Sequence, residues 1–205
     1  MLALAIQDAR DLNSRRLVNE LFKLRARVFS GRLAWNVNVR DRRETDAYDL
    51  LDPTYILVIS DDGILAGCAR LLPATGPTML ADIFKKLLAA GRLAAHPAMV
   101  ESSRFCVDTS LVRSRTAGTL HEATLTLFAG IIEWSMANGF KEVVTATDVR
   151  FERILKRAGW PMRRLGGPCR IGDTIAVAGS LAADAASFDR IRPAAYRSAI
   201  VANSE

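Results

Sequence analysis

The sequence predicts an α/β fold in which a mixed, mostly antiparallel central sheet is flanked by helices on both faces. Strand patterns alternate with helical patterns along the chain, which is typical of this class. The first two strand patterns are joined by a tight turn, so they form an antiparallel hairpin and not a parallel crossover. The length of 205 residues suits one core and leaves no room for a second. We therefore expect a single domain spanning residues 1–205.

A first helix is expected from Ser14 to about Ser30, because Ser14 can cap it and apolar residues recur at helical spacing as far as Val28. The pattern breaks between Gly31 and Pro53, a stretch rich in Arg, Asp and Asn with interleaved aromatic residues. A loop of this length inside a compact domain is usually functional or disordered. Its aromatic content favours a functional loop.

The later elements continue the alternation of strands and helices. The hairpin turns at Asp61-Asp62-Gly63, and Gly139 stands where it would end the longest helix. We expect strands at 55–60, 64–72, 100–107, 142–147 and 174–178, helices at 79–90, 117–138 and 148–158, and a polar segment after Ser180.

Composition excludes several classes of protein. Hydrophobic residues make up 50% and charged residues 24% of the chain, close to globular averages, which excludes a disordered or collagen-like chain. Three cysteines without a C-x-x-C pair and only two histidines argue against a zinc site, and we expect no bound metal. The start of the chain lacks the basic segment of a signal peptide, and the longest apolar run, 123–132, is too short to cross a membrane. We expect a cytoplasmic protein with no membrane insertion.

One block of the sequence carries a specific signature. It reads Leu24-Arg25-x3-Phe29-x2-Arg32-x2-Trp35-x-Val37-x6-Glu44-x-Asp46-x-Tyr48-Asp49, and it is continued by Arg70, Phe84, Glu101 and Arg104. At these positions and spacings the chain resembles the acyl-homoserine lactone synthases, the autoinducer synthases of bacterial quorum sensing. The resemblance covers roughly residues 8–180.

The resemblance implies an acetyltransferase-like (GNAT-like) fold and a reaction between two substrates. S-adenosylmethionine supplies the homoserine lactone, and an acyl thioester, either acyl-ACP (on acyl carrier protein) or acyl-CoA, supplies the chain. The amine attacks the thioester, and the carboxylate then displaces 5′-methylthioadenosine to close the lactone. No cofactor is implied besides these co-substrates. An N-terminal region of about residues 1–53 is expected to be mobile and to cover the substrate.

The residue types fit the groups of S-adenosylmethionine. The aromatic faces of Phe29 and Trp35 suit its sulfonium and its adenine ring, and the resemblance adds Phe84 to this set. Asp46 and Asp49 can hold the ammonium or anchor arginines.

Three arginines and one glutamate complete the candidate catalytic set. Arg25, Arg70 and Arg104 can bind the substrate carboxylate and tie the N-terminal loop to the sheet through bidentate pairs. Glu101 is the best candidate for the general base, acting directly or through a water, and partial burial would supply the raised pKa that this role needs.

The strand that carries Glu101 presents a geometric problem. On a regular strand Glu101 and Ser103 share one face while Arg104 points to the other. Glu101 and Arg104 can serve one site only if Arg104 braces the acidic loop from beneath or if a β-bulge re-aims it. We expect the bulge, because acetyltransferase-like sheets commonly splay at this strand.

The acyl end of the site follows from the resemblance. It places Ser103, Phe105, Thr145 and Thr147 near the acyl chain or thioester. Acetyltransferases bind pyrophosphate at a Gly-rich loop and helix N-terminus, but the segment 113–119 has a single glycine, which favours a donor held by its pantetheine arm.

Charge is the unusual term of the composition, and it leaves other functions open. Lys and Arg total 28 against 22 Asp and Glu, a net charge of +6. A basic nucleic-acid-binding protein is one alternative, which we rank last because the arginines are scattered and those of the signature stand among acids. A generic GNAT-type N-acyltransferase using acyl-CoA is the other, and the weak Gly-rich loop argues against it. The surplus could instead dock acyl carrier protein or the phosphates of coenzyme A, with Arg113, Arg115, Lys156, Arg157, Arg163 and Arg164 as candidates.

Overall fold

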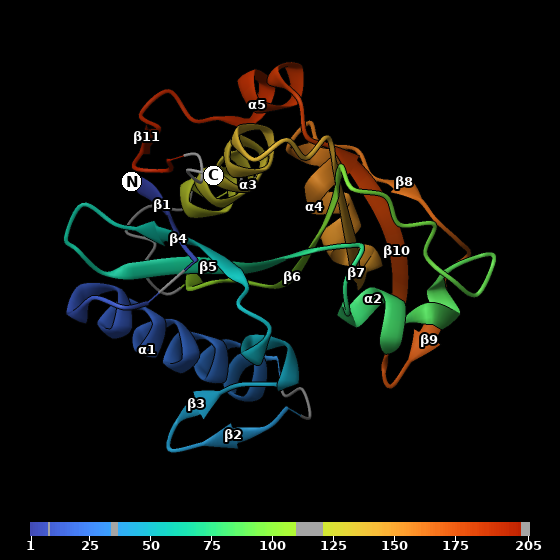
Figure 1. Ribbon diagram of the computed structural model, residues 1–205, viewed down its shortest axis with the longest axis horizontal. Helices are drawn as coiled ribbons and strands as arrows, with labels where there is room; N and C mark the ends of the chain where they lie inside the picture. Colours follow the sequence, from blue (N-terminus) through green and yellow to red (C-terminus); the bar gives the residue numbers. More distant parts are fainter. Residues whose placement is uncertain (8, 34–36, 110–120, 202–205) are drawn as a thin grey trace.

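The computed structural model describes residues 1–7, 9–33, 37–109 and 121–201, and its centre is a nine-stranded sheet (Figure 1). The strand order is β11-β1-β4-β5-β6-β7-β10-β8, with β9 paired to β10. Among these pairs β1–β11 and β6–β7 are parallel and the rest are antiparallel, so the predicted mixed, mostly antiparallel sheet is confirmed. The strands are β1 (Leu2–Ile6), β4 (Thr54–Ile59), β5 (Leu65–Pro73), β6 (Met99–Val107), β7 (Glu142–Asp148), β8 (Arg163–Arg164), β9 (Cys169–Ile171), β10 (Thr174–Ala182) and β11 (Arg197–Ser198).

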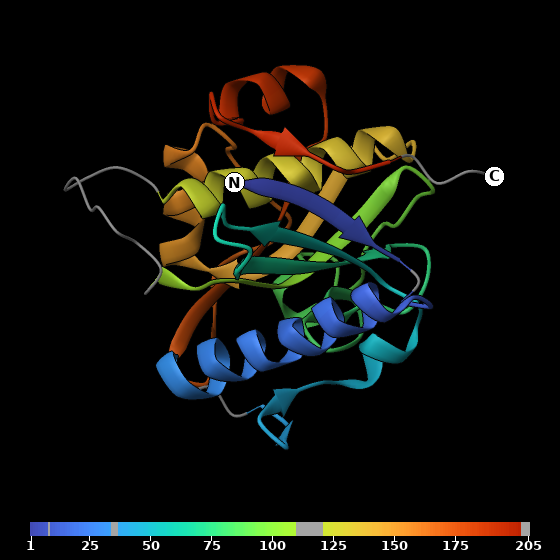
Figure 2. The same cartoon turned by 90° about the vertical axis from the view of Figure 1, so that its left-hand side faces the viewer.

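One face of the sheet carries α3 (Glu122–Ala137) and α4 (Val149–Arg157), with α5 (Ala185–Ile191) packed outside α3 (Figures 1 and 2). The core on this face contains Ile56 of β4, Phe128 of α3 and Leu155 of α4, all at most 1% exposed. Asp148 caps α4 as predicted, because its carboxylate accepts a hydrogen bond from Phe151 N at 2.7 Å.

The opposite face carries α1 (Leu12–Ala26), which buries Leu21 and Leu24 against Leu57 of β4. The short helix α2 (Met79–Asp82) and the turn η3 (Lys85–Leu87) cover the neighbouring part of the same face, where Leu80 packs in a core with Val144 of β7. Helices on both faces were predicted, and the structure confirms them.

The beginning of α1 differs from the prediction. The cap is Asp11, three residues before the predicted Ser14, and its carboxylate accepts a hydrogen bond from Ser14 N at 2.9 Å. The α-helix ends at Ala26 and continues as a π-helical turn, η1 (Arg27–Arg32).

Other boundaries also changed. The stretch 31–53 contains the small hairpin of β2 (Val39–Arg40) and β3 (Arg43–Glu44) and the 3₁₀ turn η2 (Ala47–Leu50). The predicted helix 79–90 breaks at Phe84, which leaves the helical region, while β10 extends four residues beyond the predicted end. The predictions missed the strands β1, β8, β9 and β11 and the helix α5. Part of the predicted helix 117–138 lies outside the described residues.

A β-bulge lies where β5 meets β6. Arg70 pairs with Ser103 and Cys68 with Cys106, so Arg104 and Phe105 together face Ala69. Arg104 has φ of +53°, a left-handed conformation that few non-glycine residues adopt. The predicted bulge is therefore confirmed. Beyond Glu101 the strands β6 and β7 no longer pair.

No helix in the described part of the chain is both long and apolar enough to span a membrane.

Candidate active site

Three arginines and three carboxylates form a buried ionic cluster between α1 and the sheet. The arginines come from α1, β5 and β6, and the carboxylates come from the single segment 44–49, so the cluster ties this segment to the sheet. The formal charges of the six side chains cancel. The members are Arg25, Arg70, Arg104, Glu44, Asp46 and Asp49.

Arg25 is 1% exposed and uses its whole guanidinium fork. Its Nε donates to Glu44 Oε2 at 2.5 Å, and its Nη1 and Nη2 donate to Asp49 Oδ1 and Oδ2 at 2.7 and 2.9 Å. Burial alone would lower the pKa of Arg25, but the hydrogen bonds and charges of Asp49 and Glu44 raise it above its ordinary value. The predicted anchoring of an arginine by Asp49 is seen directly.

Arg70 occupies the next position along the cluster. Its Nη1 donates to Asp46 Oδ1 at 2.5 Å and to Asp49 Oδ1 at 2.8 Å, and its Nε donates to Ser103 Oγ at 3.2 Å. Arg70 and Ser103 therefore lie on the α1 side of the sheet.

The bulge turns Arg104 to the same side. Its Nη2 lies 2.7 Å from Asp46 Oδ2, and its Nε lies 3.1 Å from Glu44 Oε1. The side chain is 14% exposed, which makes it the most accessible of the three arginines, and burial lowers its pKa.

The Asp-x-x-Asp spacing of the signature has a local cause. Asp46 caps η2 by accepting from Tyr48 N at 2.9 Å, and Asp49 Oδ2 accepts from Asp46 N at 2.8 Å, which completes a reciprocal capping box. Tyr55 donates its hydroxyl to Asp49 Oδ1 at 2.9 Å. Local hydrogen bonds thus fix the positions of the two carboxylates independently of their ion pairs with the arginines.

The cluster makes a prediction about acid stability. Burial opposes ionisation of Asp49, but Arg25 and then Arg70 outweigh it and lower its pKa to about 2. Because the folded pKa lies below the ordinary 3.8, this stabilisation is complete above about pH 4 and is lost as the pH falls towards 2, an effect of about 2 kcal/mol. A ¹³C NMR titration of the Asp49 carboxyl should show a midpoint near pH 2. A midpoint near 3.8 would contradict the pairing.

Glu101 lies at the α2 end of β6 and is 1% exposed. Its Oε2 accepts from Leu80 N at 2.6 Å and its Oε1 from Met79 N at 3.2 Å, and the Thr78 hydroxyl adds a third hydrogen bond. Burial raises the pKa of Glu101 above its ordinary value, although these hydrogen bonds and the charge of Arg70 act in the opposite direction. The predicted pKa elevation is therefore present. Glu101 also fastens α2 to the sheet, a role that was not predicted.

Aromatic side chains border this group of charges. Phe29 is buried, and the guanidinium carbon of Arg104 lies 5.7 Å from its ring centroid. Tyr48 lies 5.5 Å from the guanidinium of Arg70 and donates its hydroxyl to Asp82 Oδ2 at 3.1 Å. Phe84 is partly buried beside the α2 core, while Trp35 lies outside the described residues.

Two members of this arrangement had no assigned role in the sequence. Glu44, which is fully buried, pairs with both Arg25 and Arg104, and Thr78 supports Glu101. For Glu44 the signal was its place in the signature. For Thr78 the sequence held no signal, since it lies 23 residues from its partner.

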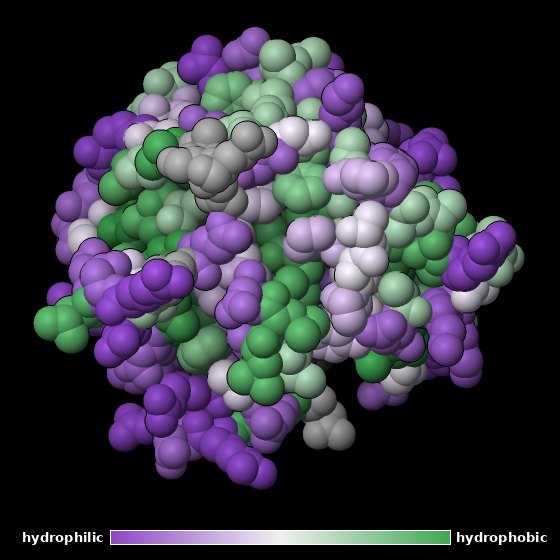
Figure 3. All heavy atoms as spheres, viewed as in Figure 1, coloured by the Kyte–Doolittle hydropathy of each residue, from purple (hydrophilic) through white to green (hydrophobic). Residues whose placement is uncertain are grey.

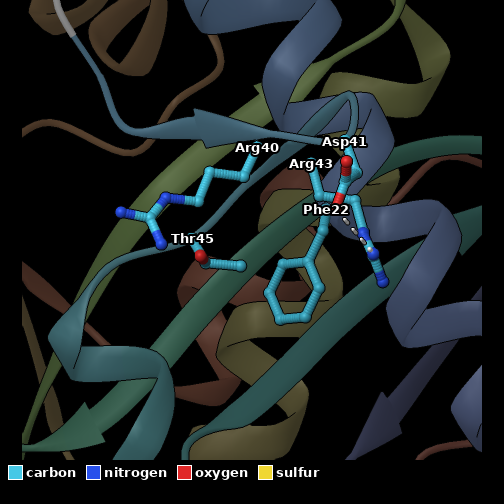
Figure 4. Close-up of a pocket in the computed structure, with 5 residues that line it drawn as sticks. All are labelled: Phe22, Arg40, Asp41, Arg43 and Thr45. Atoms are coloured by element: carbon cyan, nitrogen blue, oxygen red, sulfur yellow. Dashed lines mark ion pairs between the residues drawn. The ribbon is translucent and has the colours of Figure 1, made fainter.

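Two shallow hollows open between α1 and the β2–β3 hairpin. The first, of about 240 Å³, is lined by Phe22, Arg40, Asp41, Arg43 and Thr45, and Figure 4 shows these side chains around it. Figure 3 shows hydrophilic side chains gathered over this hairpin at the lower left. The second hollow, of about 370 Å³, shares Phe22 and Thr45 and reaches Asp46 and Asp49 from outside. In the described part of the chain, no three His, Cys, Asp or Glu side chains are grouped to hold a metal ion.

The model of the family described as autoinducer synthase matches residues 9–191.

The chain belongs to the autoinducer synthase family.

The curated relatives of this autoinducer synthase include an acyl-homoserine-lactone synthase of Agrobacterium fabrum (strain C58). It is 63% identical over 184 residues, covering 90% of this chain and 87% of that protein. Among solved structures, the acyl-homoserine lactone synthase LasI matches with a TM-score of 0.76 at 34% identity, covering 92% of this chain and 94% of that chain.

More distant structures show the fold. The CoA-dependent acyl-homoserine lactone synthase BjaI, solved with SAM and isopentyl-CoA, has a TM-score of 0.83 at 23% identity, covering 99% of this chain and 94% of that chain. An N-acetyltransferase from Lactobacillus plantarum matches with a TM-score of 0.59 at 16% identity, covering 90% of this chain and all of that chain. The predicted acetyltransferase-like fold is confirmed.

In this autoinducer synthase the four residues expected at the acyl end fall on two sides of the sheet. Ser103 faces the ionic cluster through Arg70, whereas Phe105 packs on the α3 side, with ring centroids 5.1 Å from Phe128 and 4.9 Å from Phe151. Thr145 and Thr147 alternate with Val144, which faces α2, so they share the α3 side with Phe105.

Proposed function

We propose that the chain is an acyl-homoserine lactone synthase that makes a quorum-sensing signal. It acylates the amine of S-adenosylmethionine from an acyl thioester, closes the lactone and releases 5′-methylthioadenosine. The observation that carries this proposal is the neutral cluster of Arg25, Arg70 and Arg104 with three carboxylates, placed beside Glu101 in a chain that matches the autoinducer synthase family.

Glu101 is the general base in this proposal. The amine must lose a proton as it attacks the thioester carbonyl, and a carboxylate with a raised pKa suits this transfer, directly or through a water. The new N–C bond forms while the C–S bond of the thioester breaks, and the acyl carrier leaves as its free thiol. In the second step the substrate carboxylate oxygen attacks the γ carbon of the methionine portion, which is bonded to the sulfonium. The sulfur leaves as the neutral thioether of 5′-methylthioadenosine.

Binding of S-adenosylmethionine falls mainly to Arg104 and its neighbours. Arg104 has the most exposed side chain of the three arginines and is assigned to the substrate carboxylate. Phe29, Phe84 and Trp35 offer aromatic faces to the sulfonium and adenine. Asp46, with a side chain 18% exposed, is the carboxylate best placed for the ammonium.

Arg25, Arg70 and Asp49 act as positioning residues. Their polar groups are taken up by hydrogen bonds to one another and to neighbouring side chains, and these bonds hold the segment 44–49 over the sheet. We keep the proposal of one domain spanning residues 1–205 and place its substrate-covering part in residues 27–53, because β1 and α1 belong to the sheet and its core.

The acyl chain is assigned to the α3 side of the sheet, along Phe105, Thr145 and Thr147, with Ser103 near the thioester. This placement is supported by the separation of β6 from β7 beyond Glu101, which opens the sheet between these residues. The donor is acyl-ACP or acyl-CoA; the related BjaI was solved with isopentyl-CoA.

The deciding experiment incubates the purified protein with S-adenosylmethionine and a panel of acyl-ACP and acyl-CoA donors. Release of 5′-methylthioadenosine together with an acyl-homoserine lactone, identified by mass spectrometry, supports the proposal. Acyl transfer to another amine with S-adenosylmethionine ignored would instead identify a generic N-acyltransferase. No release with any donor would contradict the synthase activity.

Basic residues beside α4 and β8 are proposed to receive the acyl donor. Reversing two exposed charges, Lys156→Glu with Arg163→Glu, is expected to raise the KM for the acyl donor several-fold. The KM for S-adenosylmethionine should stay unchanged, because these surface charges attract only the donor. The measurement is made at low salt, since salt screens this attraction. Arg16→Glu on α1 is the matched control. An unchanged donor KM would refute this docking site. Arg157 and Arg164 belong to the same surface, while Arg113 and Arg115 lie outside the described residues.

A further inference from the structure

Arg32 belongs to the signature but has no part in the chemistry above. It lies on η1, the π-helical turn in which Leu33 N–H donates to the Val28 carbonyl at 2.9 Å. Turns of this kind are rare and are frequently found at functional sites. The same turn carries Phe29, whose buried ring lies against the guanidinium of Arg104.

Arg32 reaches from η1 to the end of β6. Its Nη1 donates to Thr109 Oγ1 at 2.7 Å and to the Val107 carbonyl oxygen at 3.2 Å. Arg27, at the start of the same turn, lies 3.5 Å from Asp108 through its Nη2. The consecutive residues 107–109 therefore contact both ends of η1. The Arg27 side chain is 55% exposed and its ion pair contributes little, so the two hydrogen bonds of Arg32 are the attachment that fastens the turn.

The attachment of η1 to the end of β6 matters for the candidate active site because each of these two segments contributes a side chain to it. The segment η1 presents Phe29, and β6 presents Arg104 from its bulge, three residues before Val107. The η1 turn interrupts the regular hydrogen bonding of the helix that precedes it, and the Arg32 hydrogen bonds tie this turn to the end of β6. The Arg32 contact therefore controls where Phe29 lies relative to Arg104.

We propose that Arg32 is a positioning residue that sets Phe29 against Arg104 and thereby sets the affinity for S-adenosylmethionine. The inference rests on the proposed function, in which Phe29 and Arg104 bind that substrate. Both hydrogen bonds leave a single nitrogen, Nη1. A lysine ammonium has three hydrogens and can supply both bonds, whereas methionine has the length of the stem and no donor. The proposed positioning by residue 32 thus requires hydrogen-bond donors at the place that Arg32 Nη1 occupies.

The test measures 5′-methylthioadenosine release at varied S-adenosylmethionine for the wild type, Arg32→Met and Arg32→Lys. We expect Arg32→Met to raise the KM about tenfold with kcat reduced by less than about threefold, and Arg32→Lys to stay within about twofold of the wild type. Thr109→Val should raise the KM less, and its effect should largely disappear in the Arg32→Met background. Arg27→Met removes the other exposed arginine of this turn, which makes one ion pair at 3.5 Å in place of two hydrogen bonds, and it should change the KM by less than about twofold.

Two results would overturn the inference: a wild-type KM in Arg32→Met, or equal losses in Arg32→Lys and Arg32→Met. Calorimetric binding of S-adenosylmethionine to the same variants gives a second readout that needs no turnover. A wild type that turns over while Arg32→Met keeps its affinity defeats the inference alone. A wild type that neither binds S-adenosylmethionine nor turns over defeats the proposed function, and this inference with it.

Discussion

Replacing Arg25 with alanine is expected to lower the free energy of unfolding by about 3–5 kcal/mol, the range observed when one partner of a buried ion pair is removed. The guanidinium supplies three hydrogen bonds to two carboxylates that are almost inaccessible to water, Glu44 and Asp49. Alanine would leave both carboxylates short of donors inside the core. Urea unfolding followed by circular dichroism measures the loss.

A control on the same helix separates this effect from a general loss of charge. Lys23 pairs with Glu20 at 2.8 Å, but both side chains are about two-fifths exposed, so Lys23→Ala should cost less than about 1 kcal/mol. Arg25→Lys should fall between the two, because lysine keeps the charge and loses the fork. If Arg25→Ala and Lys23→Ala unfold at the same urea concentration, the cluster does not stabilise the fold.

Glu101→Gln is expected to reduce kcat by about 10²- to 10⁴-fold, the usual contribution of a general base. The amide cannot take the proton of the attacking amine. Its oxygen can still accept the hydrogen bond from Leu80 N, so α2 should remain attached and the fold should persist. Methylthioadenosine release measures the rate, and circular dichroism checks the fold.

The pH profile distinguishes a base from a structural carboxylate. Burial raises the pKa of Glu101 above 4.5, and the base acts when ionised, so kcat/KM of the wild type should rise with pH through a midpoint above 4.5. Thr78→Val removes a hydrogen bond that lowers this pKa and should move the midpoint upward. Glu152→Gln, on the surface of α4, should keep both kcat and midpoint. Full turnover in Glu101→Gln would place the base elsewhere.

The sequence patterns predicted those elements whose signal is local. The hairpin of β4 and β5 has a long apolar run on each side of Asp61-Asp62-Gly63, and both strands lie where expected. The pairs β2–β3 and β1–β11 involve only two residues of at least one strand, too few for a periodic pattern. Their formation depends on tertiary contacts.

The candidate site shows the same division. The direction of the Arg104 side chain could be predicted. Glu101 and Arg104 had to serve one site, but a regular strand would point them to opposite faces of the sheet, so a bulge was needed. The partners of Arg25 could not be assigned from spacing, since Glu44 and Asp49 reach it across 19 and 24 residues of chain. Asp46 and Asp49 were expected either to hold an ammonium or to anchor arginines. The structure shows both of them paired with arginines, and the ammonium role of Asp46 stays a prediction.

The strand β11 has a consequence for behaviour at high concentration. An unpaired edge strand offers free N–H and C=O groups to the sheet of another molecule, which is a common route to aggregation. Here β11 pairs with Leu2 and Ala3 of β1, and the hydroxyl of Tyr196, the residue before β11, donates to Glu133 at 2.5 Å. The segment after α5 thus limits edge-to-edge association of the sheet. A tag or truncation that displaces it is expected to lower solubility without raising catalytic activity.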